Sequence, residues 1–268
     1  MFPPLPVCGL WRNFKQVSRI INMNSSNLLN KVIVITGGGS GLGRSIAIKV
    51  ADLGAKVALI ARTEKELREV KDLIITKKGT AEYYICDTRN LDQVKNTIKN
   101  IFDNFQQIDI LVNNAGIWTD EDLEKDNSDL RNTALETNVM GHINFTYEVL
   151  PYFKKRGEGY IFNVISTSGI GDIPSGNNVL WKTYGATKWA MTGFTKALRD
   201  ELKDTKIKVT GFHPGGFDSM LYEKAKRSNP HNQPWMMKTD DVADIIVFAL
   251  TRPKDVLMER IIVTKIIQ

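Results

Sequence analysis

KVIVITGGGSGLG, residues 31–43, joins a short run rich in valine and isoleucine to a turn rich in glycine. β-Branched side chains fit a pleated sheet that is covered on both faces, so the run predicts a buried strand. A helical pattern begins directly after the turn, at Arg44. Glycines let the backbone approach a ligand, and the N–H groups and positive dipole end of a helix suit a pyrophosphate. This order of elements indicates a dinucleotide site that opens an α/β domain, although a tight turn alone also needs glycine.

The composition is that of an ordinary globular domain. The chain has 268 residues, 42% of them hydrophobic and 25% charged, which suits one large α/β domain with an ample core. No apolar stretch approaches the length of a transmembrane helix, so we expect a cytoplasmic protein without a membrane span. Cys8 and Cys86 are far apart, and none of the three histidines has ligand spacing. We therefore expect neither a disulfide framework nor a metal site.

The formal net charge of +6 raises the question of a nucleic-acid partner. The basic residues are scattered along the expected helical faces and form no basic-aromatic platform, so we expect no nucleic-acid partner. A solvated surface that also attracts an anionic cofactor explains the charge better.

The first 22 residues differ in character from the rest of the chain. They are rich in proline at the start, basic, and free of aspartate and glutamate. A transit peptide is one interpretation, and a loose extension in front of the domain is the other. Serine is scarce there, so we favour the extension while organelle targeting stays open. We expect an N-terminal extension over 1–27, outside the fold, and a single domain over 28–268.

Strand-like apolar runs alternate with helical patterns along the chain. Strict alternation with short links implies right-handed crossovers and a parallel sheet that is covered on both faces. We therefore predict a Rossmann-like, doubly wound α/β fold of about seven parallel strands, with ligands beyond the carboxyl ends of the strands. The strands are expected at 31–36, 56–61, 81–86, 108–113, 160–166, 206–212 and 260–264. The helices are expected at 44–53, 64–77, 91–105, 129–155, 184–202 and 240–250.

The segment 217–238 breaks this alternation. It carries Pro230, Pro234, aromatic residues and three methionines. One interpretation is a mobile substrate flap that excludes water from a ligand. The other is a surface helix and loop packed on the core, and the pattern does not separate the two.

Tyr184 and Lys188 lie four residues apart at the start of an expected helix, which places both side chains on one face. A tyrosine with a pKa near 10 is a poor acid or base at neutral pH. A neighbouring cation favours the phenolate and lowers that pKa toward the working range. The spacing alone means little, because Tyr222 and Lys226 repeat it.

The context of Tyr184 distinguishes it from Tyr222. A strand ending in Ser166 precedes it, and Asn113-Asn114-Ala115-Gly116 and Asn138 come earlier. Each element has a plain explanation as a strand end, a turn or a buried amide. Their joint occurrence in this order resembles the short-chain dehydrogenase/reductase family, from about residue 30 to 265. The residues that match its motifs are Thr36, Gly37, Gly41 and Gly43, the Asn-Asn-Ala-Gly at 113–116, Tyr184 with Lys188, and Pro214 with Gly215.

The resemblance implies a catalytic tetrad of Asn138, Ser166, Tyr184 and Lys188. Tyr184 would be the general acid for carbonyl reduction and the base for alcohol oxidation, and Ser166 would orient the substrate oxygen. Lys188 would lower the pKa of Tyr184 and bind the nicotinamide ribose. Asn138 would hold a water that links Lys188 to solvent. Ser166 and Tyr184 are farther apart than the family commonly shows, which implies a longer loop beside the substrate.

The second expected strand, in KVALIAR, ends in Ala61 and Arg62. A site that prefers NAD usually places a carboxylate here for the ribose 2′-hydroxyl, and a carboxylate repels a 2′-phosphate. Ala61 removes that repulsion, and the guanidinium of Arg62 is a planar, permanently charged group that binds phosphate well. An ordinary surface arginine at a helix start is the alternative. We predict NADP as the cofactor, with NAD less favoured.

The resemblance also implies which residues line the cofactor and substrate sites. Asp87 resembles the residue that meets the adenine amino group, and Ser219 stands where the family often has threonine. The predicted cofactor-binding residues are Gly37, Gly39, Ser40, Gly41, Leu42, Gly43, Arg62, Asp87, Thr88, Asn114, Ala115, Gly116, Tyr184, Lys188, Pro214, Gly215, Phe217 and Ser219. The predicted substrate contacts are Ser168, Asn178, Trp181, Tyr184 and Leu221.

These features lead to one hypothesis: an NADP(H)-dependent oxidoreductase that interconverts a small-molecule carbonyl and a secondary alcohol by hydride transfer. The alternative is a catalytically silent dinucleotide-binding protein that senses redox state or serves as a scaffold. The complete tetrad argues against it, because a silent protein has no need for a proton relay. The resemblance also implies a homodimer or homotetramer that pairs the helices around 129–155 and 184–202. The physiological substrate stays open.

Overall fold

The structure is a computed structural model that describes residues 28–119, 127–171, 182–225 and 231–266, so the predicted extension at 1–27 lies outside it. Within these residues, the strands form one seven-stranded parallel sheet of order β3-β2-β1-β4-β5-β6-β7. This confirms the predicted Rossmann-like sheet. The strands are β1 (Val32–Thr36), β2 (Lys56–Ala61), β3 (Thr80–Ile85), β4 (Ile110–Asn113), β5 (Glu158–Val164), β6 (Lys206–Pro214) and β7 (Arg260–Val263).

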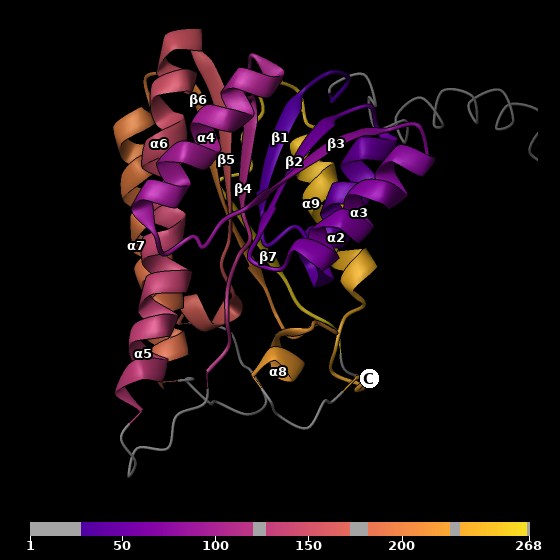
Figure 1. The fold of residues 1–268 in the computed structure, drawn as a ribbon. Helices are drawn as coiled ribbons and strands as arrows, with labels where there is room; N and C mark the ends of the chain where they lie inside the picture. The colour runs from indigo at the N-terminus through magenta and orange to yellow at the C-terminus, as the bar shows by residue number, and fades with distance from the viewer. Residues whose placement is uncertain (1–27, 120–126, 172–181, 226–230, 267–268) are drawn as a thin grey trace, which may run out of the picture.

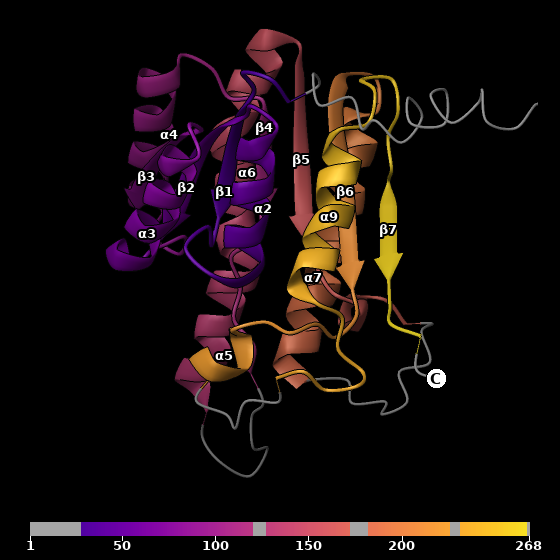
Figure 2. The same ribbon diagram turned by 90° about the vertical axis from the view of Figure 1, so that its right-hand side faces the viewer.

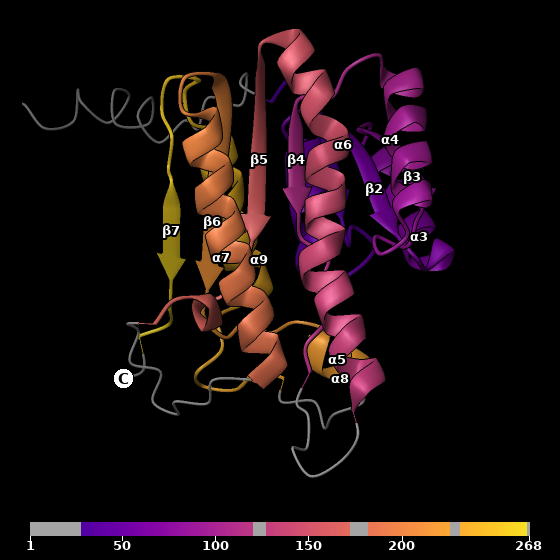
Figure 3. The same ribbon diagram turned by 90° about the vertical axis from the view of Figure 1, so that its left-hand side faces the viewer.

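Helices cover both faces of the sheet, as predicted (Figure 1). One face carries α2 (Gly41–Asp52), α3 (Glu64–Thr76) and α9 (Thr239–Leu250), which Figure 2 shows from their own side. The other face carries α4 (Leu91–Phe105), α6 (Gly141–Arg156) and α7 (Lys182–Leu202), with α5 (Ser128–Leu135) near its lower end (Figure 3). The strand order reverses between β1 and β4, so a crevice is expected beyond their carboxyl ends.

The core lies on the two sides of β1. Ile33 and Ile35 pack into the apolar cluster under α2 and α9, while Val32 and Val34 pack into the cluster under α4 and α6. All five residues of β1 are buried, which is why this strand reads as a continuous apolar run. The strand therefore holds the glycine turn that follows it at the centre of the sheet edge.

One predicted helix is divided in the structure. The expected helix over 129–155 consists of α5, a π-helical turn η3 (Glu136–Met140) and α6. The prediction of a continuous helix was wrong, because the residues around Asn138 form wider i→i+5 turns. The predicted ranges 56–61 and 91–105 match β2 and α4, and the other boundaries move by at most three residues; α2 begins at Gly41 rather than at Arg44.

The segment 217–238 carries the short helix α8 (Leu221–Lys224), and its residues 226–230 lie outside the described part. Its two ends are paired, since Met237 N donates to Gly216 O at 3.0 Å and Asp218 N donates to Met237 O at 2.9 Å. The ring of Trp235 lies so close to Gly216 that an added Cβ would be 2.3 Å from it. The described parts of the segment are therefore held against the sheet edge, and opening of a flap stays a prediction.

Large apolar side chains are exposed along the face formed by α5, α6 and α7. They are Leu130, Leu135, Tyr147 and Trp189, with Met140 of the π-helical turn beside them. None of the helices in the described part combines the length and the apolar character that a bilayer-spanning segment needs.

Candidate active site

The glycine turn and the Asn-Asn-Ala-Gly turn are bound together at the carboxyl ends of β1 and β4. Thr36 Oγ1 accepts hydrogen bonds from Asn114 N at 2.9 Å and Ala115 N at 3.0 Å. Asn114 Nδ2 donates to Thr36 O at 2.9 Å. Gly37 has a φ of +68°, and an added Cβ on Gly43 would lie 2.1 Å from the Gly37 carbonyl oxygen. Only glycine therefore fits these two positions, and the turn leaves backbone open toward a ligand.

A cleft of about 400 Å³ opens beside these two turns. Thr137 lines this cleft, and its buried hydroxyl has no hydrogen-bond partner in the described part of the chain. The unpartnered hydroxyl of Thr137 and the glycine turn, whose open backbone a larger side chain would block, suit a polar ligand that carries a phosphate. The site therefore fits a dinucleotide. The cleft is lined by Gly37, Ala61, Arg62, Thr63, Glu66, Cys86, Asp87, Thr88, Ala115, Gly116, Ile117, Trp118, Thr119, Leu130, Thr137, Leu221, Lys224 and Ala225.

Six of the eighteen predicted cofactor residues line this cleft: Gly37, Arg62, Asp87, Thr88, Ala115 and Gly116. Arg62 lines the cleft, is exposed, and makes no hydrogen bond or ion pair with any other residue that the structure describes, although its charge helps to lower the pKa of Asp87. Asp87 lies there too, but its carboxylate already accepts from Arg89, with Nη2 at 2.6 Å. Hydrogen bonds from Arg89 lower the pKa of Asp87, so the carboxylate stays charged. Leu42 is instead buried in the core, and Phe217 packs against it.

The π-helical turn positions Asn138, whose side chain is fully buried. Asn138 Oδ1 accepts from Ile117 N at 2.8 Å, and its Nδ2 donates to Ile117 O at 2.9 Å. The same Nδ2 reaches Thr187 Oγ1 on α7 at 3.2 Å. Asn138 therefore ties the segment after β4 to the helix that carries Tyr184 and Lys188.

Lys188 is 5% exposed, and its ammonium lies 5.4 Å from the centroid of the Tyr184 ring. The ammonium has no hydrogen bond or ion pair within the described residues, although a Cβ placed on Gly116 would be 3.9 Å from it. Burial lowers the pKa of Lys188 from 10.5 to about 8. The fold thus keeps a buried cation beside the Tyr184 ring and close to Gly116, which lines the cleft, without a counter-ion among the described residues.

We expect the substitution Lys188→Met to stabilise the protein at pH 7. The unfolded amine binds its proton up to about pH 10.4, and the folded amine only up to about pH 8. The unfolded chain therefore binds more protons between these values, so the stability penalty is complete below pH 8 and is relieved as the pH rises. Methionine removes the penalty, and the free energy of unfolding at pH 7 should rise by about 3 kcal/mol.

Urea unfolding of the wild type and the variant at pH 7 and pH 10 measures this difference. Lys196→Met is the matched control, because Lys196 lies on the same helix with its side chain 67% exposed and paired with Asp200 at 2.7 Å. An unchanged or lower stability of Lys188→Met at pH 7 would contradict the prediction.

Ser166 lies two residues beyond the end of β5, and its Oγ accepts from Ser168 N at 3.1 Å. The short turn that follows, η4 (Thr167–Gly169), packs tightly on α7, since a Cβ on Gly169 would lie 2.5 Å from the carbonyl oxygen of Lys188. Ser166 is thereby held beside the helix that carries Lys188.

Two buried histidines support this site. His213 Nδ1 donates to the carbonyl of Ser166 at 3.1 Å, and His142 Nε2 donates to the carbonyl of Ala115 at 2.6 Å. Burial, together with the charge of Lys188, lowers the pKa of both histidines to about 4, so both are neutral donors at pH 7. Sequence reasoning missed them, because it examined histidines for metal-ligand spacing only.

The substrate side is described in part. Asn178 and Trp181 lie outside the described residues. Leu221, a predicted substrate contact, lines the cleft together with Ala61 and Arg62, at the end expected for the adenosine. Lys224 and Glu66 line the same end, and sequence reasoning named neither of them.

Comparison with known proteins places the chain in a family. The sequence model for short chain dehydrogenases matches residues 31–230. An uncharacterized oxidoreductase of Staphylococcus epidermidis is 32% identical over 84% of this chain and 93% of its own length. An NADP-dependent 3-hydroxy acid dehydrogenase of Schizosaccharomyces pombe is 32% identical over 87% of this chain and 92% of its own length. The structure of an alcohol dehydrogenase from the archaeon Thermococcus sibiricus, complexed with 5-hydroxy-NADP, superposes with a TM-score of 0.79 at 25% identity, over 89% of this chain and 97% of the other.

The chain therefore belongs to the short-chain dehydrogenase family of oxidoreductases.

Proposed function

We propose that this protein is an NADP(H)-dependent oxidoreductase that interconverts a carbonyl and a secondary alcohol. The observation that carries the proposal is the buried ammonium of Lys188, which has no counter-ion among the described residues. It lies beside the Tyr184 ring and close to Gly116, which lines a nucleotide-sized cleft. A buried cation without a counter-ion is unfavourable for stability, so its retention points to use in chemistry. A bound nicotinamide would supply or accept the hydride.

The protein residues position the substrate and move a proton. Tyr184 donates its phenolic proton to the carbonyl oxygen during reduction and takes it back during oxidation. The cation of Lys188 favours the phenolate and so lowers the pKa of Tyr184. The Ser166 hydroxyl donates to the same substrate oxygen, and Asn138 holds a water on the path from Lys188 to solvent. This division of roles rests on the family's tetrad and on the geometry described above.

NADP is the proposed cofactor. Arg62 offers an exposed guanidinium directly after β2, where Ala61 places no carboxylate in the way of a 2′-phosphate. The fission-yeast relative is NADP-dependent, and the archaeal structure holds an NADP derivative. The fission-yeast protein acts on 3-hydroxy acids, which makes a small hydroxy acid the first substrate class to test.

A fluorescence titration of the purified protein with NADPH and with NADH tests the cofactor without any assumption about the substrate. We expect NADPH to bind more tightly by about tenfold or more, because a phosphate gains charge-assisted hydrogen bonds that a hydroxyl lacks. Oxidation of 3-hydroxy acids and reduction of small ketones are then followed at the nicotinamide absorbance. Binding without turnover of any substrate would favour the silent redox sensor, and tighter binding of NADH would contradict the NADP assignment.

The oligomeric state is proposed as a homodimer or homotetramer built through α5, α6 and α7. The exposed apolar side chains of this face, among them Tyr147 and Trp189, support it, because such patches on a soluble surface mark interaction sites. Sedimentation velocity tests it, and a monomeric mass at micromolar concentration would contradict it.

A further inference from the structure

Lys224 places an ammonium across the adenosine end of the cleft. Its Nζ lies 2.7 Å from Ser40 Oγ in the glycine turn and 3.4 Å from Glu66 Oε2 on α3. Lys224 lines the same cleft as Arg62 and Thr63. Three elements that are distant in sequence therefore meet at one charged point beside the end of β2.

The fold holds α8 in this place. Met220 precedes the helix and lies over Gly41, where an added Cβ would be 3.9 Å from Met220 Cγ. Lys224 N donates to Met220 O at 3.0 Å, which closes the helical turn under the side chain. His231 contacts the carboxylates of Asp218 and Glu223, so the start of the segment is tied to its later part. These contacts fix the position of α8 and therefore of the Lys224 ammonium.

Glu66 and Arg62 line the same end of the cleft, and Lys224 supplies the cation that pairs with Glu66. Glu66 pairs with Lys224 and makes no other ion pair among the residues that the structure describes, while Asp87 is neutralised by Arg89. Arg62 makes no hydrogen bond or ion pair with the residues that the structure describes, and it interacts with Asp87 through its charge. Without Lys224, an uncompensated carboxylate would face the place where the ribose 2′ position is expected.

We infer that Lys224 determines cofactor specificity: its ammonium binds the 2′-phosphate of NADP(H) jointly with Arg62 and neutralises Glu66. This inference rests on the proposed function. A phosphate carries nearly two negative charges and gains from both cations, whereas a 2′-hydroxyl gains little from them. A bare Glu66 carboxylate has the opposite preference, because it accepts a hydrogen bond from a hydroxyl and repels a phosphate. Both effects of Lys224 therefore favour NADP(H) over NAD(H).

The test compares two fragments that lack the nicotinamide, adenosine 2′,5′-bisphosphate and 5′-AMP, by calorimetric titration of the full chain. In Lys224→Gln, we expect the bisphosphate to bind about tenfold more weakly or worse, with 5′-AMP unchanged within about twofold. Adding Glu66→Gln to this variant should recover part of the lost affinity. Lys49→Gln is the matched control, because Lys49 is also paired with a carboxylate, Asp244 at 2.7 Å, but lies between α2 and α9.

An equal loss of affinity for both fragments would overturn the inference, because Lys224 would then only hold α8 in place. Unchanged affinity for the bisphosphate would overturn it as well. The proposed function fails separately: a wild-type protein that prefers NADH to NADPH refutes the NADP assignment. If the wild type prefers NADPH and Lys224→Gln binds the bisphosphate as tightly as the wild type, only the role of Lys224 is refuted.

Discussion

Substitution of Tyr184 by phenylalanine is expected to lower kcat for carbonyl reduction by about 10³-fold. The substitution keeps the ring, above which the Lys188 ammonium lies 5.4 Å from the centroid, and removes the only atom that carries the transferable proton. The other residues predicted to hold the cofactor are unchanged, and Phe keeps the ring, so the affinity for NADPH should stay within about twofold. Loss of turnover with retained binding is the pattern of a residue that acts in the transition state.

Steady-state kinetics on the best substrate of the screen, together with an NADPH titration, measure both quantities. Tyr84→Phe is the matched control, because Tyr84 lies on β3 and accepts a hydrogen bond from Asn104 on α4 at 3.1 Å. It should keep full activity. Retention of more than about a tenth of kcat in the Tyr184 variant would show that another group supplies the proton.

The sheet and its order could be predicted because they depend on local signals. The continuous apolar run of β1 and the glycine turn after it are features of one short stretch, and burial on both faces selects their residues. The place of Tyr184 and Lys188 at the start of α7 followed from a four-residue spacing and its context. Each of these features is set by neighbours in sequence.

The division of the predicted helix at 129–155 could not be predicted in the same way. The π-helical turn brings both ends of the Asn138 amide onto the backbone of Ile117, a segment 21 residues earlier in the chain. That pairing exists only after β4 and the helices have packed. Local propensity has no signal for it, since ETNVM is an ordinary helical pattern.

The charged end of the cleft depends on tertiary structure for the same reason. Lys224 lies 184 residues after Ser40 and 158 after Glu66, and the four-residue helix that carries it has no clear periodic signal. Arg62 was found because it directly follows a recognisable strand. Functional residues at strand ends can therefore be predicted from sequence. Residues on the segment that packs over the cleft, such as Lys224, cannot.

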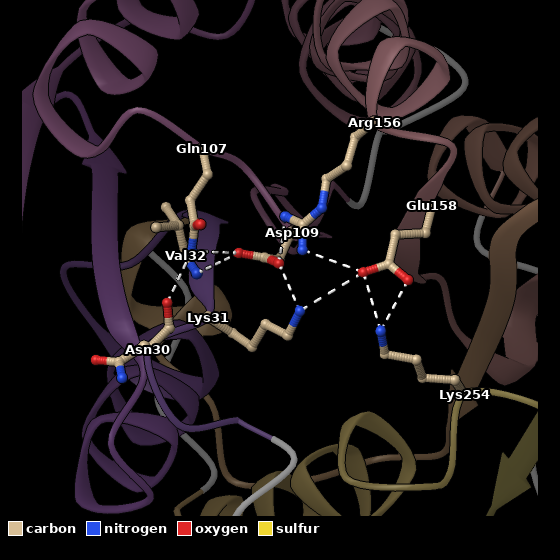
Figure 4. A network of polar contacts seen from close by, with 8 residues as sticks. All are labelled: Asn30, Lys31, Val32, Gln107, Asp109, Arg156, Glu158 and Lys254. Carbon is tan, nitrogen blue, oxygen red and sulfur yellow. Dashed lines mark hydrogen bonds and ion pairs between the residues drawn. The ribbon is translucent and has the colours of Figure 1, made fainter.

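The opposite edge of the sheet carries a network of charges whose loss we expect to affect stability rather than catalysis. Figure 4 shows Asp109, just before β4, at its centre. Its side chain is 4% exposed and lies 2.9 Å from Lys31 Nζ and 2.5 Å from Arg156 Nη1. Its Oδ2 also accepts from Val32 N at 2.7 Å. Asp109 thus joins the starts of β1 and β4 to the end of α6, far along the strands from Tyr184.

We expect Asp109→Ala to lower the free energy of unfolding by about 3 kcal/mol. The substitution removes the buried carboxylate that Lys31 and Arg156 share and leaves the N–H of Val32 without an acceptor, while both cations keep their contact with Glu158. Breaking a buried ion pair costs about 3–5 kcal/mol. The lower end of that range applies because the side chains of Lys31 and Arg156 are 25% and 29% exposed, so water compensates part of the loss. Asp109→Asn keeps an acceptor for Val32 N and should lose less, about 2 kcal/mol.

Urea unfolding followed by circular dichroism measures these changes, and NADPH affinity at 25 °C should be unchanged in each folded variant. Lys254→Ala is the control within the same network, because Lys254 pairs with Glu158 at 2.8 Å but its side chain is 78% exposed. Exposed pairs contribute at most about 1 kcal/mol, so this variant should unfold close to the wild type. If Asp109→Ala and Lys254→Ala lost the same small amount, burial would not set the strength of this network. We expect Asp109→Ala to lose more free energy of unfolding than Lys254→Ala, because water can replace the partner of an exposed charge but cannot reach Asp109.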